Sequence, residues 1–245
     1  MTNIVLLSHL LFGFALFLLS AGICRYLTRH PISMDIPNQR SSHDTPVPKS
    51  GGIAIVFTFL AGVTAIYAFA DIAVIKGYFF LGFVSSALLI AIVSFVDDLF
   101  TTPAFFRLLA QSLAAGAVMA FGIVIHEVTL PWAGIVQLGV FGYAVTFLWI
   151  VGLTNAFNFM DGINGISGGT TIVACLFFGY ISYALGSNFT YIITYTLIAG
   201  TLGFTLFNFP RAKLFMGDVG SAFLGFVLAA LAIIAALYDL SLIHI

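Results

Sequence analysis

Charged residues are what this sequence has least of. Of its 245 residues only 7% are Asp, Glu, Lys or Arg, whereas 61% are hydrophobic and the mean hydropathy is +1.15. A soluble domain carries about 25% charged residues, so this composition excludes an ordinary water-exposed globular surface. The eight basic and nine acidic residues nearly cancel, which argues against a nucleic-acid partner.

Cysteine is also scarce. The chain has two, Cys24 and Cys175, and both fall inside long apolar runs. Two cysteines in that setting predict neither a disulfide framework nor a zinc site. We find no internal repeat and no polar segment that would form a soluble domain. A single membrane domain over residues 1–245 is therefore predicted.

What the sequence has in abundance is apolar runs of membrane-spanning length. A helix needs about 20 mostly apolar residues to cross a bilayer. By that criterion we predict an all-α, polytopic membrane protein with about eight transmembrane helices. The expected helices cover residues 4–24, 51–70, 77–96, 105–125, 137–157, 168–186, 190–207 and 219–237.

The basic residues indicate how these helices are oriented. The predicted spans put four linkers on one side of the membrane: 25–50, 97–104, 158–167 and 208–218. Of the eight Lys and Arg residues, all but Lys76 belong to that side. Because cytoplasmic linkers carry an excess of Lys and Arg, we expect these four linkers to face the cytoplasm.

Two adjacent acids end the third predicted helix in "SFVDDLF", residues 94–100. The carboxyl end of a helix carries partial negative charge, so Asp97 and Asp98 are unfavourable there unless a cation compensates them. Neighbouring helical residues point about 100° apart. One carboxylate can therefore bind an ion while the other orients a water molecule or a basic group. A solvated helix end is the alternative interpretation.

Two further acids lie in glycine-rich linkers, "NAFNFMDGINGISGG" and "FPRAKLFMGDVGSAFLG". We expect Asp161 and Asp218 at the amino ends of the sixth and eighth helices, where free backbone N–H groups bind phosphates and glycine allows close approach. Helix capping explains either acid alone. It does not explain the polar and basic residues around them: Asn155, Asn158, Asn164, Asn208, Arg211 and Lys213.

The first inner linker contains "RSSHDTPVPKSGGIAI", in which His43 and Lys49 can hold an anionic group. Taken alone, such a linker is more often a topology anchor or a lipid-headgroup contact. Taken together, the four linkers offer oxygen ligands for Mg²⁺ or Mn²⁺, basic side chains for phosphates and helix amino ends. They predict a site for a diphosphate substrate with a membrane-embedded acceptor.

Four stretches resemble the polyprenyl-phosphate N-acetylhexosamine-1-phosphate transferases, in that family's order: "HDTPVPKSGGIAI", "VSFVDDL", "NAFNFMDGINGISGG" and "NFPRAKLFMGDVGSAFLG". The family includes phospho-N-acetylmuramoyl-pentapeptide transferase and enzymes that begin O-antigen synthesis. The resemblance implies Mg²⁺-dependent transfer of a sugar-1-phosphate from a UDP-N-acetylhexosamine to undecaprenyl phosphate. It also implies release of UMP, an O-antigen-type lipid-linked product and a cytoplasm-facing site in the bacterial inner membrane.

Residue roles follow from the same resemblance. Asp97, Asp98 and Asp161 match catalytic positions, and Asp218 with Asp98 matches the metal-binding acids. Asn164 departs from the family, because many relatives have a second acid there in "DGIDG". An amide supplies neither a base nor negative charge. The positions that match substrate contacts are His43, Lys49, Asn158, Asn164, Asn208, Arg211 and Lys213.

Two alternatives remain open. The first is a catalytically incomplete, C-terminally short piece of such an enzyme. The family continues through further helices and a loop with an H-x-H pattern, whereas this sequence ends at "YDLSLIHI". A secondary transporter is another, since acids in membrane helices mark ion pathways. The clustering of acids at one face favours the transferase. Membrane lipid is an expected partner, and a homodimer is left open.

Overall fold

The computed structural model describes residues 3–37, 44–69, 77–100 and 102–238. Within them the chain forms eight helices: α1 (Asn3–Arg29), α2 (Gly52–Phe69), α3 (Gly77–Phe100), α4 (Ala104–Ala120), α5 (Phe141–Met160), α6 (Ile166–Leu185), α7 (Asn188–Asn208) and α8 (Asp218–Tyr238). It also forms two short antiparallel strand pairs: β1 (Met34–Asp35) with β2 (Val47–Pro48), and β3 (Glu127–Leu130) with β4 (Gly134–Gln137).

The predicted all-α membrane architecture is confirmed. Every predicted helix is present, and seven are long and apolar enough to cross a bilayer. The helix α4 is shorter, with 17 residues. The predicted start of α5 at residue 137 was wrong, because residues 127–137 form the β3–β4 hairpin and the helix begins at Phe141. Of the hairpin residues, only Gln137 had been counted as part of the span.

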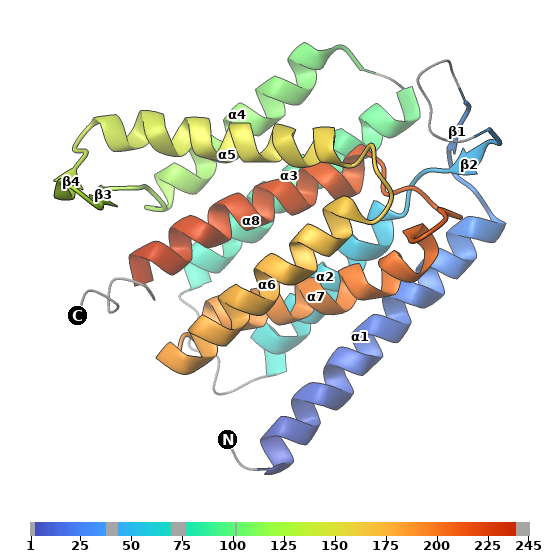
Figure 1. The fold of residues 1–245 in the computed structure, drawn as a ribbon, viewed down its shortest axis with the longest axis horizontal. Coiled ribbons are helices and arrows are strands. Elements are labelled where there is room, and N and C mark those ends of the chain that lie inside the picture. Colours follow the sequence, from blue (N-terminus) through green and yellow to red (C-terminus); the bar gives the residue numbers. More distant parts are fainter. Residues whose placement is uncertain (1–2, 38–43, 70–76, 101, 239–245) are drawn as a thin grey trace.

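The helix α8 lies at the centre of the bundle. It packs against α2, α3 and α5 (Figure 1), and 89% of its most apolar 18-residue window is buried. Its sequence, "DVGSAFLGFVLAALAIIAALY", is apolar on all sides after the first residues. A helix of that kind is buried all round, which is the position that α8 takes.

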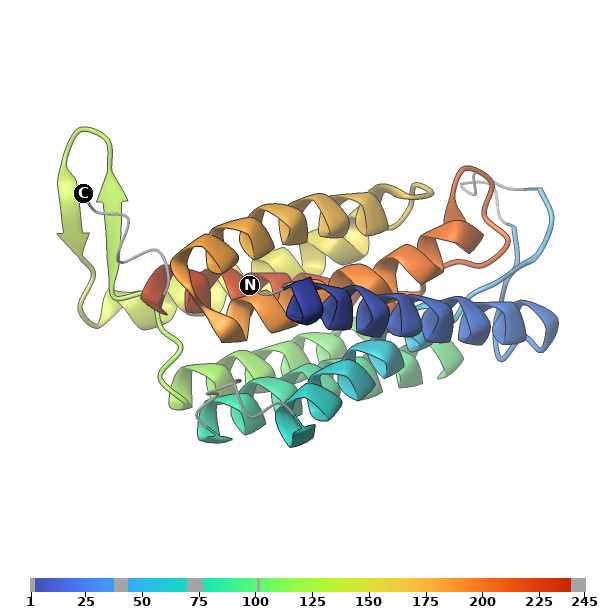
Figure 2. The ribbon, with the colours of Figure 1, turned by 90° about the horizontal axis from the view of Figure 1, so that it is seen from below.

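The connections from α1 to α2, α3 to α4, α5 to α6 and α7 to α8 all lie at one end of the bundle, which we call the four-linker end. The hairpin and the start of α1 lie at the other end (Figures 1 and 2). The four linkers grouped by sequence analysis therefore do meet in space.

Glycines join α2 to α8 at the four-linker end. The N–H of Gly52 donates to the carbonyl of Met216 over 2.8 Å. A Cβ on Gly52 would lie 2.2 Å from the backbone nitrogen of Gly220, closer than side chains approach. Glycine at this point lets the two backbones touch. The start of α2 thereby fixes the start of α8.

We predict that Gly52→Ala destabilises the protein, because the new methyl group forces α2 away from α8. Overpacking of this kind costs about 1–3 kcal/mol. The midpoint of thermal unfolding in detergent should fall. Gly116→Ala in α4 is the matched control, since a Cβ there meets nothing within 4 Å. Equal midpoints for the two variants would contradict the close approach of α2 and α8.

Candidate functional site

Three carboxylates meet where α3 ends and α8 begins. Asp97 and Asp98 lie in the last turn of α3, and Asp218 is the first residue of α8. The relative exposure of Asp97 is 8% and that of Asp98 is 6%, whereas the side chain of Asp218 is 30% exposed. The packing of α3 on α8 thus brings the carboxyl end of one helix to the amino end of the other.

The carboxylate of Asp98 caps α8. Its Oδ1 accepts the backbone N–H of Asp218 over 3.1 Å, and its Oδ2 accepts that of Val219 over 3.0 Å. The Lys49 ammonium lies 3.5 Å from Oδ1. Gly217, at φ 75°, has no side chain to fill this space, because a Cβ there would lie 2.7 Å from Oδ2 of Asp98. Negative charge at a helix amino end is stabilising.

Asp97 has different partners. Its Oδ1 accepts hydrogen bonds from the backbone N–H of Thr102, at 2.6 Å, and from the Thr102 hydroxyl, at 2.5 Å. Its Oδ2 lies 3.4 Å from Nη1 of Arg107, and the same nitrogen donates to Oδ2 of Asp218 over 3.0 Å. One guanidinium nitrogen of α4 is therefore shared by two acids from α3 and α8.

Asp161 directly follows the last residue of α5. The expectation that it stands at the amino end of α6 was wrong, because the left-handed Gly165 intervenes and α6 begins only at Ile166. Burial raises the pKa of Asp161 to about 8, and the negative charges of Asp218 and Asp98 add to this rise in pKa. The carboxyl end of a helix is also unfavourable for a carboxylate. Asp161 thus belongs electrostatically to the acid cluster.

The asparagines predicted to contact substrate make contacts within the protein. Asn158 donates from Nδ2 to the Ser221 hydroxyl over 3.1 Å, joining α5 to the first turn of α8. The buried Asn208 accepts the N–H of Gly165 over 2.7 Å and donates to the carbonyl of Leu214 over 3.2 Å. Asn208 therefore holds the α5–α6 and α7–α8 linkers together. Its nucleotide contact remains a prediction.

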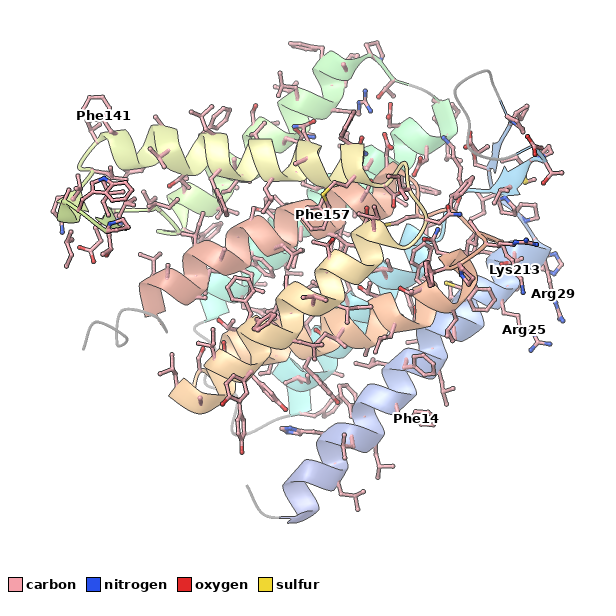
Figure 3. All side chains as sticks on the ribbon, in the orientation of Figure 1. Phe14, Arg25, Arg29, Phe141, Phe157 and Lys213 are labelled. Carbon is pink, nitrogen blue, oxygen red and sulfur yellow. The ribbon has the colours of Figure 1, made fainter. Side chains whose placement is uncertain are left out.

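The remaining predicted residues lie apart from the carboxylates or are not described. Arg211 and Lys213 are exposed on the α7–α8 linker, and Figure 3 shows Lys213 at the same end of the molecule as Arg29. Asn164 is half-buried in the α5–α6 linker. His43 lies outside the described residues.

Sequence analysis missed Arg107, which was assigned only to a side of the membrane. It is the one basic residue in the α4 sequence, "AFFRLLAQSLAAGAVMA". A charged side chain in an apolar helix marks a functional site by default, so the sequence of α4 alone could have indicated Arg107 as a site residue. One turn further along α4, Gln111 exchanges hydrogen bonds with Asn155 of α5, at 2.6 and 3.4 Å.

The acid pair on Arg107 fits a divalent cation. Asp97 and Asp218 each direct an oxygen at one nitrogen, whereas both oxygens of Asp98 face backbone N–H groups. Among the described residues no group of three or more His, Cys, Asp or Glu side chains is arranged to hold a metal. Mg²⁺ often binds through one or two carboxylates together with substrate phosphates, so two converging acids suit it.

We predict that Asp98→Asn destabilises the protein more than Asp218→Asn. The first change places an amide N–H₂ against backbone N–H groups and removes a charged hydrogen-bond acceptor, a loss of about 1.5–3 kcal/mol. The second removes only a partly exposed ion pair, which contributes about 0–1 kcal/mol. Thermal unfolding of the two variants in one detergent compares them. Equal losses of stability would mean that Asp98 does not cap α8.

The raised pKa of Asp161 predicts a pH dependence of stability. The folded state favours the protonated acid, so this contribution is complete at low pH and is lost as pH rises through about 8. The unfolding midpoint of the metal-free protein should fall between about pH 5 and pH 8, where the folded state keeps a proton that the unfolded state has lost, and less steeply for Asp161→Asn. Glu127→Gln, at the other end of the molecule, should keep the wild-type slope. A wild-type slope in Asp161→Asn would contradict the burial of this acid.

Comparisons with known proteins identify relatives of this chain. The sequence model described as Glycosyl transferase family 4 matches residues 80–236, which include all four acids of the site. A probable undecaprenyl-phosphate N-acetylglucosaminyl 1-phosphate transferase of Bacillus subtilis (strain 168) is 31% identical over 216 residues, 87% of this chain and 58% of the relative.

Two phospho-N-acetylmuramoyl-pentapeptide-transferases are also similar. That of Streptococcus equi subsp. equi (strain 4047) is 32% identical over 81% of this chain and 62% of the relative. That of Leuconostoc mesenteroides subsp. mesenteroides is 35% identical over 52% of this chain and 41% of the relative. The chain thus spans less than two thirds of the length of these relatives. With the family match covering more than half of its residues, the chain belongs to glycosyl transferase family 4.

Proposed function

We propose that this protein transfers an N-acetylhexosamine-1-phosphate from a UDP-sugar to undecaprenyl phosphate and releases UMP. The observation that carries the proposal is the charge cluster at the four-linker end: Asp97, Asp98 and Asp218 with Lys49 and Arg107. Such a cluster is exceptional in a chain with 7% charged residues. The name of the Bacillus subtilis relative supports undecaprenyl phosphate as the acceptor and an N-acetylglucosaminyl 1-phosphate as the transferred group.

The proposed reaction exchanges one phosphoanhydride for another. An oxygen of the lipid phosphate attacks the phosphorus that carries the sugar and forms a new P–O bond. The bond from that phosphorus to the oxygen shared with UMP breaks, and UMP leaves with the electron pair. A phosphate monoester has a second pKa of about 6, so the attacking oxygen is ionised near neutral pH without a protein base.

The protein's part in this reaction is positioning and charge stabilisation. Charge spreads over the phosphoryl oxygens in the transition state, and positive groups in a fixed arrangement stabilise it. Arg107 and Lys49 supply such charge, and the amino end of α8 adds its partial positive charge. Asp97 and Asp218 would hold Mg²⁺, or Mn²⁺ in its place, which neutralises the diphosphate when bound.

The remaining polar residues are assigned by resemblance. Asp161 and Asn158 face the nucleotide sugar in this proposal, and Asn208 supports that pocket through the two linkers that it joins. Arg211, Lys213 and the predicted contacts His43 and Asn164 complete the substrate side of the site. The product would start an O-antigen-type glycan.

We place the four-linker end at the cytoplasmic face of the bacterial inner membrane. Exposed arginines at the end of α1, Arg25 and Arg29, and exposed Arg211 and Lys213 on the α7–α8 linker share this end. An excess of Lys and Arg on one side is typical of cytoplasmic linkers. Both substrates would then reach the acids from the inner leaflet.

The test is transfer of label from UDP-N-acetylglucosamine to undecaprenyl phosphate by purified protein, with Mg²⁺ and with a chelator. Asp97→Asn and Asp218→Asn should each lower the rate about 10²–10³-fold, the usual effect of removing one electrostatic partner. Chelation should remove the activity, and Mg²⁺ should restore it.

Glu127→Gln, in the hairpin at the other end of the molecule, is the control and should transfer at the wild-type rate. Equal rates for Asp218→Asn and wild type would overturn the proposed site. Uptake of label into sealed vesicles without a lipid-linked product would support a transporter instead.

A further inference from the structure

A positively charged group, the guanidinium of Arg107, lies between Asp97 and Asp218. Nη1 of Arg107 lies 3.0 Å from Oδ2 of Asp218 and 3.4 Å from Oδ2 of Asp97. The three side chains come from α4, α8 and α3, so the bundle brings two acids to one point and places a guanidinium nitrogen there. Two carboxylates this close raise each other's energy unless a positive charge separates them.

We propose that Arg107 and the divalent cation exchange at this position. Arg107 holds Asp97 and Asp218 in place before the ion arrives, and the incoming ion displaces the guanidinium from both acids. The freed guanidinium then binds the diphosphate of the substrate. This inference rests on the proposed function for its divalent cation and its diphosphate.

The two cations cannot share the position. Mg²⁺ binds carboxylate oxygens at about 2.0–2.1 Å, so an ion held by both Oδ2 atoms would lie between the same two acids that Nη1 now joins. Positive charges at such short range also repel each other strongly. Binding of the ion therefore requires that the arginine side chain leave.

Arg107 is free to leave, whereas its neighbours are not. Its side chain is 37% exposed, and partly exposed ion pairs hold weakly. Asp97 stays in place through the two hydrogen bonds from Thr102. Lys49 is held by Asp98, whose side chain is only 2% exposed. The site thus holds Asp97 firmly, whereas Arg107 is the most exposed member of its ion pairs.

The freed side chain suits a diphosphate. A guanidinium presents several N–H donors in a planar fork that matches two phosphate oxygens at once. Arg107 lies in the first turn of α4, which starts at Ala104 directly after the α3–α4 linker. A substrate bound through the divalent ion to Asp97 and Asp218 brings its phosphates to this place.

Direct measurement of metal binding tests the exchange. Mn²⁺ is titrated into purified, substrate-free protein in detergent, and free Mn²⁺ is followed by electron paramagnetic resonance. Arg107→Gln should bind Mn²⁺ about tenfold more tightly than wild type, the size expected when a competitor held by two partly exposed ion pairs is removed. Arg107→Lys, which keeps the charge but loses the fork, should bind with intermediate affinity.

Arg29→Gln is the matched control, because it removes the same charge from the exposed end of α1 at the same end of the bundle. It should change the affinity for Mn²⁺ by less than about twofold, since exposed charges are screened. If Arg107→Gln does not fold, the Arg107→Lys variant decides, and its affinity must exceed that of wild type.

Mn²⁺ affinity in Arg107→Gln that is unchanged or weaker than in wild type overturns the exchange. Absence of Mn²⁺ binding in wild type and in all variants overturns it as well. The proposed function is tested separately. If Arg107→Gln binds Mn²⁺ more tightly than wild type but wild type transfers nothing to undecaprenyl phosphate, the exchange is supported and only the proposed reaction is contradicted.

Discussion

The contact between the Asp98 carboxylate and the amino end of α8 is the interaction on which the site depends. The first N–H groups of a helix have no partner within the helix, and here two of them bind one buried side chain. The same carboxylate pairs with Lys49 from the α1–α2 linker. One acid thus connects three separate parts of the chain at the start of the most buried helix.

This contact explains why two acids stand side by side at a helix end that disfavours them. Each acid has its own positive partner, the amino end of α8 and Lys49 for Asp98, and Arg107 for Asp97. Adjacent helical residues point in different directions, so the pair divides into an acid that caps α8 and one that shares Arg107 with Asp218. Gly217 leaves room for the Asp98 carboxylate, and Gly52 and Gly220 let α2 and α8 approach closely beside it.

Much of the fold was predictable, because membrane spans are set by length and hydropathy alone. The grouping of the linkers also followed, since helices that cross a bilayer alternate in direction. The partners of Asp97 and Asp98 were not predictable, because they come from tertiary packing of α3, α4 and α8. The β3–β4 hairpin was not predicted, because its residues were left between two predicted spans. Asp161 was assigned to the start of α6 because its neighbours are glycines, but α5 continues to Met160 and Asp161 directly follows it.

The place of α8 in the chain has a consequence for biogenesis. Among the eight described helices, α8 is the last to leave the ribosome. Its first two backbone N–H groups are nevertheless the hydrogen-bond donors to the Asp98 carboxylate. Until α8 inserts, a newly made chain carries a carboxylate near the bilayer surface without two of its partners. Insertion of α8 and completion of the charged centre are therefore a single event.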